Sequence, residues 1–271
     1  MEQYETLNEL ISVKNVVFSY EGSDIPVLEN VNFNIYRKDF ICVMGPSGCG
    51  KSTLLNILAG FRQPSSGDAY LELEKIEGPD WHRGVVFQQP ALYEWYSVRK
   101  NVAFGPLMRK EPKAEVFRKT DEILHQVGLD GAGDKRIYEL SGGMKQRVAI
   151  ARSLINNPEI LLMDEPFGAL DALTRQQMQD FLRKIWWNTG KTIFFITHDV
   201  DEAIRLGTRV LVMSSNPGRI VEDISLDFTT RIIREGSDKS IYSEGFFETR
   251  KHILELIEGQ QEENYNPGDD L

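Results

Sequence analysis

The 271-residue sequence contains two cysteines, Cys42 and Cys49, seven positions apart. Two cysteines at this spacing cannot build a disulfide framework, and they do not have the spacing of a zinc site. A reducing compartment, the cytoplasm, is therefore expected.

Long apolar runs are also missing. No stretch approaches the ~20 apolar residues that a helix needs to span a bilayer. The first residues, Met1–Glu5, are acidic and polar. We therefore expect neither a transmembrane segment nor a signal or transit peptide.

Basic residues are in deficit. Lys and Arg total 31 against 41 Asp and Glu, so the formal net charge is −10. A nucleic-acid groove needs clustered positive charge to neutralise phosphates, so no nucleic-acid partner is expected. A chain with this negative net charge would be repelled by anionic lipid. Any attachment to a membrane is therefore expected to go through a protein partner.

One glycine-rich stretch fits the phosphate-binding pattern G-x-x-x-x-G-K-[ST]. Its residues are Gly45, Pro46, Ser47, Gly48, Cys49, Gly50, Lys51, Ser52 and Thr53. Glycines let successive backbone N–H groups turn toward phosphates. Lys51 is expected to reach the β- and γ-phosphates, and the Ser52 hydroxyl is expected to ligate Mg²⁺.

The context of this loop agrees with the pattern. Residues 40–44 form an apolar run that suits a buried strand, and residues 53–59 suit a helix, so the phosphates would lie at a helix N-terminus. The thiol of Cys49 is expected at the edge of the β-phosphate. The loop alone leaves kinases, GTPases and many ATPases open.

A second motif, Leu140–Arg147 with the sequence LSGGMKQR, precedes another helical pattern. Ser141 is predicted to be the N-cap, so the N–H groups of Gly142 and Gly143 would face outward. The sequence therefore predicts a second anion site that lacks the lysine of the G-K-[ST] pattern.

Together these motifs resemble the ATP-binding subunits of ABC transporters, whose signature is L-S-G-G-Q or a close variant. In that family the signature of one subunit faces the P-loop of a second, and two ATP molecules lie between the chains. The resemblance covers about residues 10–258. It implies one ATPase domain over 10–230 with a helical subdomain at about 91–155, followed at 231–271 by a helix and an acidic, disordered tail.

The implied fold class is α/β. It comprises a P-loop ABC ATPase core with a mixed sheet and helices, an antiparallel β subdomain and an inserted α-helical subdomain. Residues 160–164 are apolar up to a terminal carboxylate, as in the Walker B strand of the family. Asp164 is expected to hold Mg²⁺, and Glu165 is expected to activate the attacking water as general base.

Four further residues match positions of the family's site. His198 follows a β-rich run and matches the switch histidine that contacts the γ-phosphate. Gln88 matches the glutamine that touches Mg²⁺ and water, although the adjacent Gln89 remains an alternative. Asp171 lies in a segment that resembles the D-loop. Tyr20 matches the aromatic residue that stacks on adenine, and packing within a sheet is its alternative role.

The resemblance implies an ATP-hydrolysing subunit of a membrane importer that uses ATP and Mg²⁺. The signature variant is similar to that of importers. The turn at 217–220, the ending at 246–257 and Cys49 in the loop are similar to the nitrate, sulfonate, taurine and bicarbonate branch, so a small anionic solute is expected. The aromatic-rich segment 91–105 is expected to dock a transmembrane permease.

Other implied partners are a second copy of this or a related ATPase chain and, indirectly, an extracytoplasmic solute-binding protein. The implied location is the cytoplasmic face of the inner or plasma membrane. A soluble, non-transport ABC ATPase is the alternative, but its usual long coiled coil or second cassette is not seen in this sequence.

Overall fold

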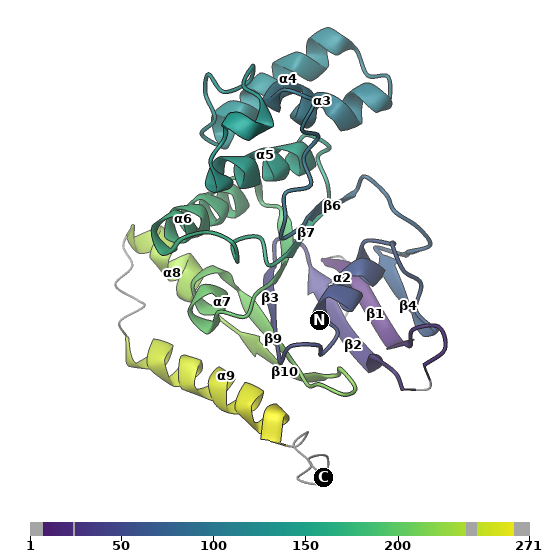
Figure 1. Cartoon of the computed structure of the whole chain (residues 1–271). Helices are drawn as coiled ribbons and strands as arrows, with labels where there is room; N and C mark the ends of the chain where they lie inside the picture. The colour runs from purple at the N-terminus through teal and green to yellow at the C-terminus, as the bar shows by residue number, and fades with distance from the viewer. Residues whose placement is uncertain (1–7, 24, 237–242, 263–271) are drawn as a thin grey trace, which may run out of the picture. The chain divides into compact units, whose positions relative to one another are not determined.

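The computed structural model describes residues 8–23, 25–236 and 243–262. The chain forms two compact units. The first unit combines residues up to Pro79 with residues from Thr192 onward, and the second unit runs from Asp80 to Lys191. In Figure 1 the purple strands near the N-terminus and the yellow helix near the C-terminus both belong to the first unit. The second unit is therefore an insertion into the first.

The first unit contains an antiparallel sheet in the order β2-β1-β4-β5. Its strands are β1 (Glu9–Phe18), β2 (Leu28–Tyr36), β4 (Ser66–Leu71) and β5 (Glu74–Lys75). Valine and isoleucine dominate the inward positions of β1, because β-branched side chains pack well on a pleated surface. Ile11, Val13 and Val16 are buried there.

The same unit contains a second set of strands built around β3. The strands are β3 (Phe40–Met44), β8 (Thr192–Ile196), β9 (Arg209–Met213) and β10 (Ile220–Ser225). β3 pairs in parallel with β8 and with β9, and β10 runs antiparallel to β9. All residues of β3 are buried. A parallel strand covered on both faces has this continuous apolar sequence.

Four helices of the described residues belong to this unit. They are α2 (Lys51–Leu58), α7 (Val200–Leu206), α8 (Phe228–Glu235) and α9 (Glu244–Glu262). The Ser243 hydroxyl accepts a hydrogen bond from the Phe246 N–H, and Phe246 packs edge-on against Phe228 of α8. Helix α9 continues to Glu262, well into the C-terminal segment in which the sequence predicts a helix followed by a disordered tail. The rest of that predicted tail lies outside the described residues.

The second unit pairs two parallel strands, β6 (Arg83–Val86) and β7 (Ile160–Asp164). Its helical elements are α3 (Val98–Met108), α4 (Lys113–Gln126), the 3₁₀ turn η1 (Ile137–Glu139), α5 (Gly142–Leu154) and α6 (Ala172–Thr189). The predicted helical segment 91–155 thus contains α3, α4 and α5. Helix α6 ends at Gly190, whose φ of 62° is left-handed, as is common at helix C-termini.

Candidate functional site

The phosphate-binding motif forms the loop between β3 and α2. Gly45 and Gly50 adopt φ values of 152° and 94°. A Cβ on Gly45 would lie 2.6 Å from the Met213 carbonyl oxygen, and one on Gly50 would lie 2.6 Å from Leu28 Cδ2. Only glycine fits these two positions, so packing as well as backbone freedom explains the motif.

The Lys51 side chain folds back over this loop. Its Nζ donates hydrogen bonds to the carbonyl oxygens of Gly45 at 2.9 Å and Pro46 at 2.8 Å. The residue is 9% exposed. The ammonium group is therefore held at the centre of the loop, where it can meet a phosphate without a large search of rotamers.

The Cys49 thiol lies close to the Lys51 ammonium, with 3.5 Å between its sulfur and Lys51 Nζ. The residue is fully buried, and a Cβ on Gly45 would lie 3.0 Å from its sulfur. Burial raises the pKa of the Cys49 thiol, although the nearby Lys51 ammonium opposes the rise. The thiol is therefore buried in this structure, and its place at the edge of a bound β-phosphate stays a prediction.

Tyr20 reaches the first turn of α2. Its Oη lies 3.3 Å from Thr53 Oγ1, and the ring is 44% exposed. Arg62 lies over the ring, with 5.0 Å between its guanidinium carbon and the ring centroid, and Phe18 packs against the ring edge-on. Tyr20 therefore lies beside the phosphate-binding helix and does not occupy the interior of a sheet.

His198 belongs to the same edge of the first unit as the phosphate loop. β8 ends at Ile196, which pairs with Val43 of β3, and the Thr197 N–H donates to the Val43 carbonyl oxygen at 3.3 Å. Both strands are parallel, so the segments after their carboxyl ends emerge together. The His198 side chain is exposed, while Thr197 before it is buried.

A second group of predicted residues meets in the second unit. Val86 of β6 pairs with Met163 of the neighbouring parallel strand β7. Gln88 follows the end of β6, and Asp164 is the last residue of β7. A Cβ built on Gly168 would lie 3.3 Å from Gln88 Nε2 and 3.7 Å from Glu165 Oε2. The Gln88 amide and the Glu165 carboxylate therefore approach the same point beside Gly168, and the choice of Gln88 over Gln89 stays a prediction.

Glu165 has an unusual backbone. Its φ is 41°, in the left-handed region that non-glycine residues seldom adopt. The chain turns sharply here, and the Gly168 N–H donates to the Glu165 carbonyl oxygen at 3.1 Å. Such strain is concentrated at functional sites, where the surrounding structure holds a side chain in one orientation.

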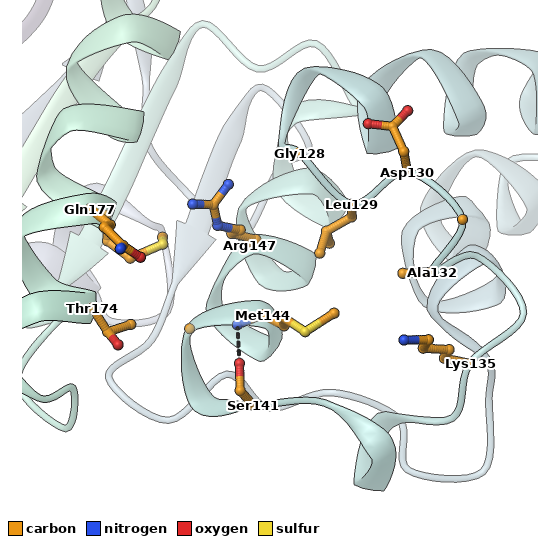
Figure 2. Close-up of a pocket in the computed structure, with 13 residues that line it drawn as sticks. Gly128, Leu129, Asp130, Ala132, Lys135, Ser141, Met144, Arg147, Thr174 and Gln177 are labelled. Atoms are coloured by element: carbon orange, nitrogen blue, oxygen red, sulfur yellow. Dashed lines mark hydrogen bonds between the residues drawn. The ribbon is translucent and has the colours of Figure 1, made fainter.

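Ser141 is the N-cap of α5, as predicted. Its Oγ accepts a hydrogen bond from the Met144 N–H at 3.4 Å, drawn as a dashed line in Figure 2. A pocket of about 390 Å³ opens beside this helix start. Figure 2 shows Lys135 on one side of Ser141 and Thr174 of α6 on the other.

The charge of this pocket suits an anion. The first N–H groups of a helix lack partners within it and carry partial positive charge. Lys135 and Arg147 add two cations to the lining, against one carboxylate from Asp130. Arg147 is held in place, because its Nη1 donates to the Val127 carbonyl oxygen at 2.8 Å and its guanidinium covers the Phe181 ring.

Asp171 has a clear local task. It is the N-cap of α6: one carboxylate oxygen accepts from the Thr174 N–H at 3.0 Å, and the other accepts from the Thr174 hydroxyl at 2.6 Å. These hydrogen bonds from the hydroxyl and the N–H lower the pKa of Asp171. The residue thus sets the start of a helix that lines the pocket at Ser141.

Some residues around these positions were not predicted from the sequence. Lys135 belongs to no motif, and Arg147 ends the second motif without a predicted role; the fold brings both to the lining of the pocket. Thr197 and Glu202 form a buried hydrogen bond next to His198. Their spacing across a helix start was the only signal that could have indicated this pair.

Comparison with known proteins identifies the setting of these motifs. The profile of the ABC transporter family matches residues 28–168. A taurine import ATP-binding protein of Ruegeria pomeroyi is 46% identical over 256 residues, which is 93% of this chain and 96% of that protein. The corresponding protein of Pelagibacter ubique is 48% identical over 259 residues, or 95% of this chain and 98% of that protein.

Solved structures give the same fold. A dimeric ATP-binding cassette in a post-hydrolysis state, bound to ADP and Pi, is 35% identical with a TM-score of 0.70, over 80% of this chain and 99% of that chain. The cbiO1 protein of Clostridium perfringens, part of the ABC transporter complex cbiONQ, is 28% identical with a TM-score of 0.75, over 92% of this chain and 99% of that chain. The predicted α/β fold class is thereby confirmed.

Proposed function

The chain belongs to the ABC transporter family of ATP-binding subunits, and we propose that it hydrolyses ATP to drive import of taurine or a related small sulfonate. The observation that carries this proposal is the similarity to taurine import ATP-binding proteins over more than nine-tenths of the chain. No observation favours the alternative of a non-transport ATPase. Among the anions expected from the sequence, the sulfonate class has the most direct support.

In the first unit, the proposed tasks are binding and orientation of the nucleotide. The phosphate loop would direct its backbone N–H groups to the phosphates, and the Lys51 ammonium would neutralise charge on the transferred γ-phosphoryl group. The Tyr20 ring, exposed beside α2, would stack on adenine. His198, exposed at the carboxyl end of β8, would contact the γ-phosphate and help to orient the attacking water.

In the second unit, the proposed tasks concern water and metal. Glu165 would take a proton from the attacking water, and its constrained backbone would hold the carboxylate in one direction. The Gln88 amide oxygen and the Asp164 carboxylate are hard oxygen donors of the kind that Mg²⁺ binds together with phosphates. In the first unit, the Ser52 hydroxyl is the proposed donor to Mg²⁺. When bound, Mg²⁺ would neutralise phosphate charge.

The signature face would serve a second copy of this or a related chain. One chain carries one phosphate loop and one signature, with no repeat. Ser141, Gly142 and Gly143 would therefore bind the γ-phosphate of ATP held by the partner, and the cations of the pocket would assist. ATP then stabilises the closed dimer by contacting both chains, and hydrolysis removes that contact.

The proposed location is the cytoplasmic face of the membrane, reached through permease subunits. None of the helices in residues 8–23, 25–236 and 243–262 has the length and apolar character that a membrane span requires. Docking would instead use the aromatic segment 91–105, and an extracytoplasmic binding protein would deliver the solute to the permease.

The test is reconstitution of the chain in liposomes with transmembrane permease subunits that co-purify with it and with their solute-binding protein. Taurine should stimulate ATP hydrolysis and enter the liposomes with ATP. The Glu165→Gln variant is the control for coupling and should support neither. If nitrate or bicarbonate stimulates ATP hydrolysis and taurine does not, the solute assignment is overturned. The assignment of ATPase activity would still hold.

A further inference from the structure

The segment around His198 is tied to its own following helix by a buried side-chain hydrogen bond. The Thr197 hydroxyl donates to Glu202 Oε2 at 2.6 Å. The same hydroxyl oxygen accepts from the Asp199 N–H at 3.0 Å. Thr197 and Asp199 flank His198, so one hydroxyl fixes the chain on both sides of the histidine.

A second set of bonds fixes the start of α7. Asp199 is its N-cap, and its Oδ1 accepts from the Glu202 N–H at 3.1 Å. Glu202 therefore contacts both neighbours of His198, one through its carboxylate and one through its backbone. These hydrogen bonds link the backbone and side chains of residues 197–202 to one another. They restrict the backbone of His198, whose side chain is exposed.

This arrangement is buried beneath the segment. Thr197 is 2% exposed and Glu202 is 5% exposed. Burial raises the pKa of the Cys42 thiol, and the charge of Glu202 raises it further. Because Cys42 belongs to β3, the Glu202 carboxylate lies near that strand. β3 leads directly into the phosphate loop, and the Thr197 N–H is bonded to Val43 of that strand. A carboxylate in such a place is costly unless it has hydrogen-bond donors, so its geometry is well specified.

From this geometry we propose that Glu202 and Thr197 are positioning residues for His198. Glu202 holds the Thr197 hydroxyl, and that hydroxyl sets the backbone on both sides of the histidine. Neither residue needs to touch the nucleotide. The inference rests on the proposed ATPase function, because the position of His198 matters only if the histidine assists hydrolysis.

A purely structural role makes a different prediction. If the Thr197–Glu202 bond only stabilised the start of α7, its loss would lower stability and leave the turnover of the folded enzyme unchanged. If the bond positions His198, its loss would lower kcat without changing the KM for ATP, because the phosphate loop and Tyr20 remain in place.

The experiment compares Thr197→Val, which removes the hydroxyl at nearly constant shape, with Thr197→Ser, which keeps it. Full-length protein is assayed for ATP hydrolysis, and thermal melting of each variant reports its folded fraction. Thr197→Val should lower kcat roughly tenfold to a hundredfold, the range seen when a supporting residue is removed, with KM within about twofold of wild type. Thr197→Ser should remain close to wild type.

The decisive comparison repeats Thr197→Val in a His198→Ala background. Residues that act through the same group are not additive, so the valine should cost less than about twofold there. If it costs the same factor with and without His198, Thr197 does not act through the histidine and the inference is overturned.

Should Thr197→Val fail to fold, the double variant Thr197→Val/Glu202→Met takes its place, because removing the carboxylate together with its hydroxyl donor leaves no buried charge without that donor. A folded double variant with wild-type kcat overturns the inference. An inactive wild type overturns the proposed function and this inference with it, whereas an active wild type and an equally active Thr197→Val overturn the inference alone.

Discussion

Arg209 of β9 donates through Nη1 to Asp39 Oδ2 at 2.7 Å, although the two residues are 170 positions apart. The same nitrogen donates to the Asn34 carbonyl oxygen at 3.0 Å, and Nη2 pairs with Asp223 of β10 at 2.5 Å. The side chains of Arg209 and Asp39 are 14% and 17% exposed. Burial alone would lower the pKa of Arg209, but Asp223 and Asp39 outweigh it and raise the pKa. One guanidinium thus joins four segments of the first unit.

Replacing this guanidinium should destabilise the protein. Arg209→Gln would leave the Asp39 carboxylate partly buried without its cation, and the free energy of unfolding should fall by roughly 2–4 kcal/mol. Arg219→Gln is the matched control, because Arg219 pairs with Glu29 on the surface and such pairs contribute about 1 kcal/mol or less. Urea denaturation measures both. Equal losses would show that the Arg209 cluster contributes no more than a surface pair.

Loss of the Glu165 carboxylate should stop the chemistry and spare binding. Glu165→Gln should lower the rate of ATP hydrolysis by about 10²–10⁴-fold, the usual contribution of a general base. ATP binding should persist, and an ATP-bound dimer should accumulate in size-exclusion chromatography. Glu122→Gln, a surface residue of α4 paired with Arg118, serves as the control and should be unchanged. Near-normal hydrolysis by Glu165→Gln would assign the base to another residue.

Catalysis should need two chains. Lys51→Ala removes the ammonium of the phosphate loop, and Ser141→Arg fills the signature face, so each homodimer should be inactive. A mixture of the two variants can form one intact composite site in each heterodimer and should regain part of the activity. Full hydrolysis by wild-type monomers at high dilution would refute the two-chain site.

The aromatic cluster in segment 91–105 separates into packed and exposed parts. Tyr93 lies 4.6 Å from Phe104 between ring centroids, whereas Trp95 is 68% exposed. Aromatic residues dominate many interfaces, so Trp95→Ala should weaken assembly with the permease and leave the ATPase of the isolated subunit near wild type. Trp187→Ala, at another exposed tryptophan, is the control and should leave both the assembly and the ATPase near wild type. If Trp95→Ala loses folding and assembly to the same extent, Trp95 is a packing residue of the subunit.

The cap at Asp171 should make stability depend on pH. Hydrogen bonds from Thr174 lower the pKa of Asp171 in the folded protein below its unfolded value. The ionised form is therefore favoured by folding, and its contribution is present above the unfolded pKa and lost as pH falls through the folded pKa. Asp171→Asn keeps a capping oxygen but does not titrate.

The measurement for this cap is urea denaturation of wild type and Asp171→Asn from neutral pH down to about 3. The wild-type advantage should be present at neutral pH and shrink toward zero in acid. A difference between the two proteins that stays constant over this range would rule out titration of Asp171 as its origin.

Several features followed from the sequence because their causes are local. The phosphate loop needs glycine at set positions within nine residues, and the structure gives Gly45 and Gly50 the backbone that glycine permits. Ser141 caps α5 as predicted, since a cap depends on a residue and its next turn. The fold class and family are confirmed. The roles of individual site residues remain predictions.

Other features were decided by tertiary structure, because they depend on which segments lie side by side. The Arg209–Asp39 pair requires the parallel pairing of β3 with β9, which no local pattern specifies. The burial of the Cys49 thiol depends on the packing around Gly45, where a Cβ would lie 3.0 Å from the sulfur. The hydrogen bond from Thr197 to Glu202 joins two side chains that the fold buries at the start of α7. The sequence by itself therefore determined the motifs and their chemistry, whereas strand order and burial decided which side chains hold them in position.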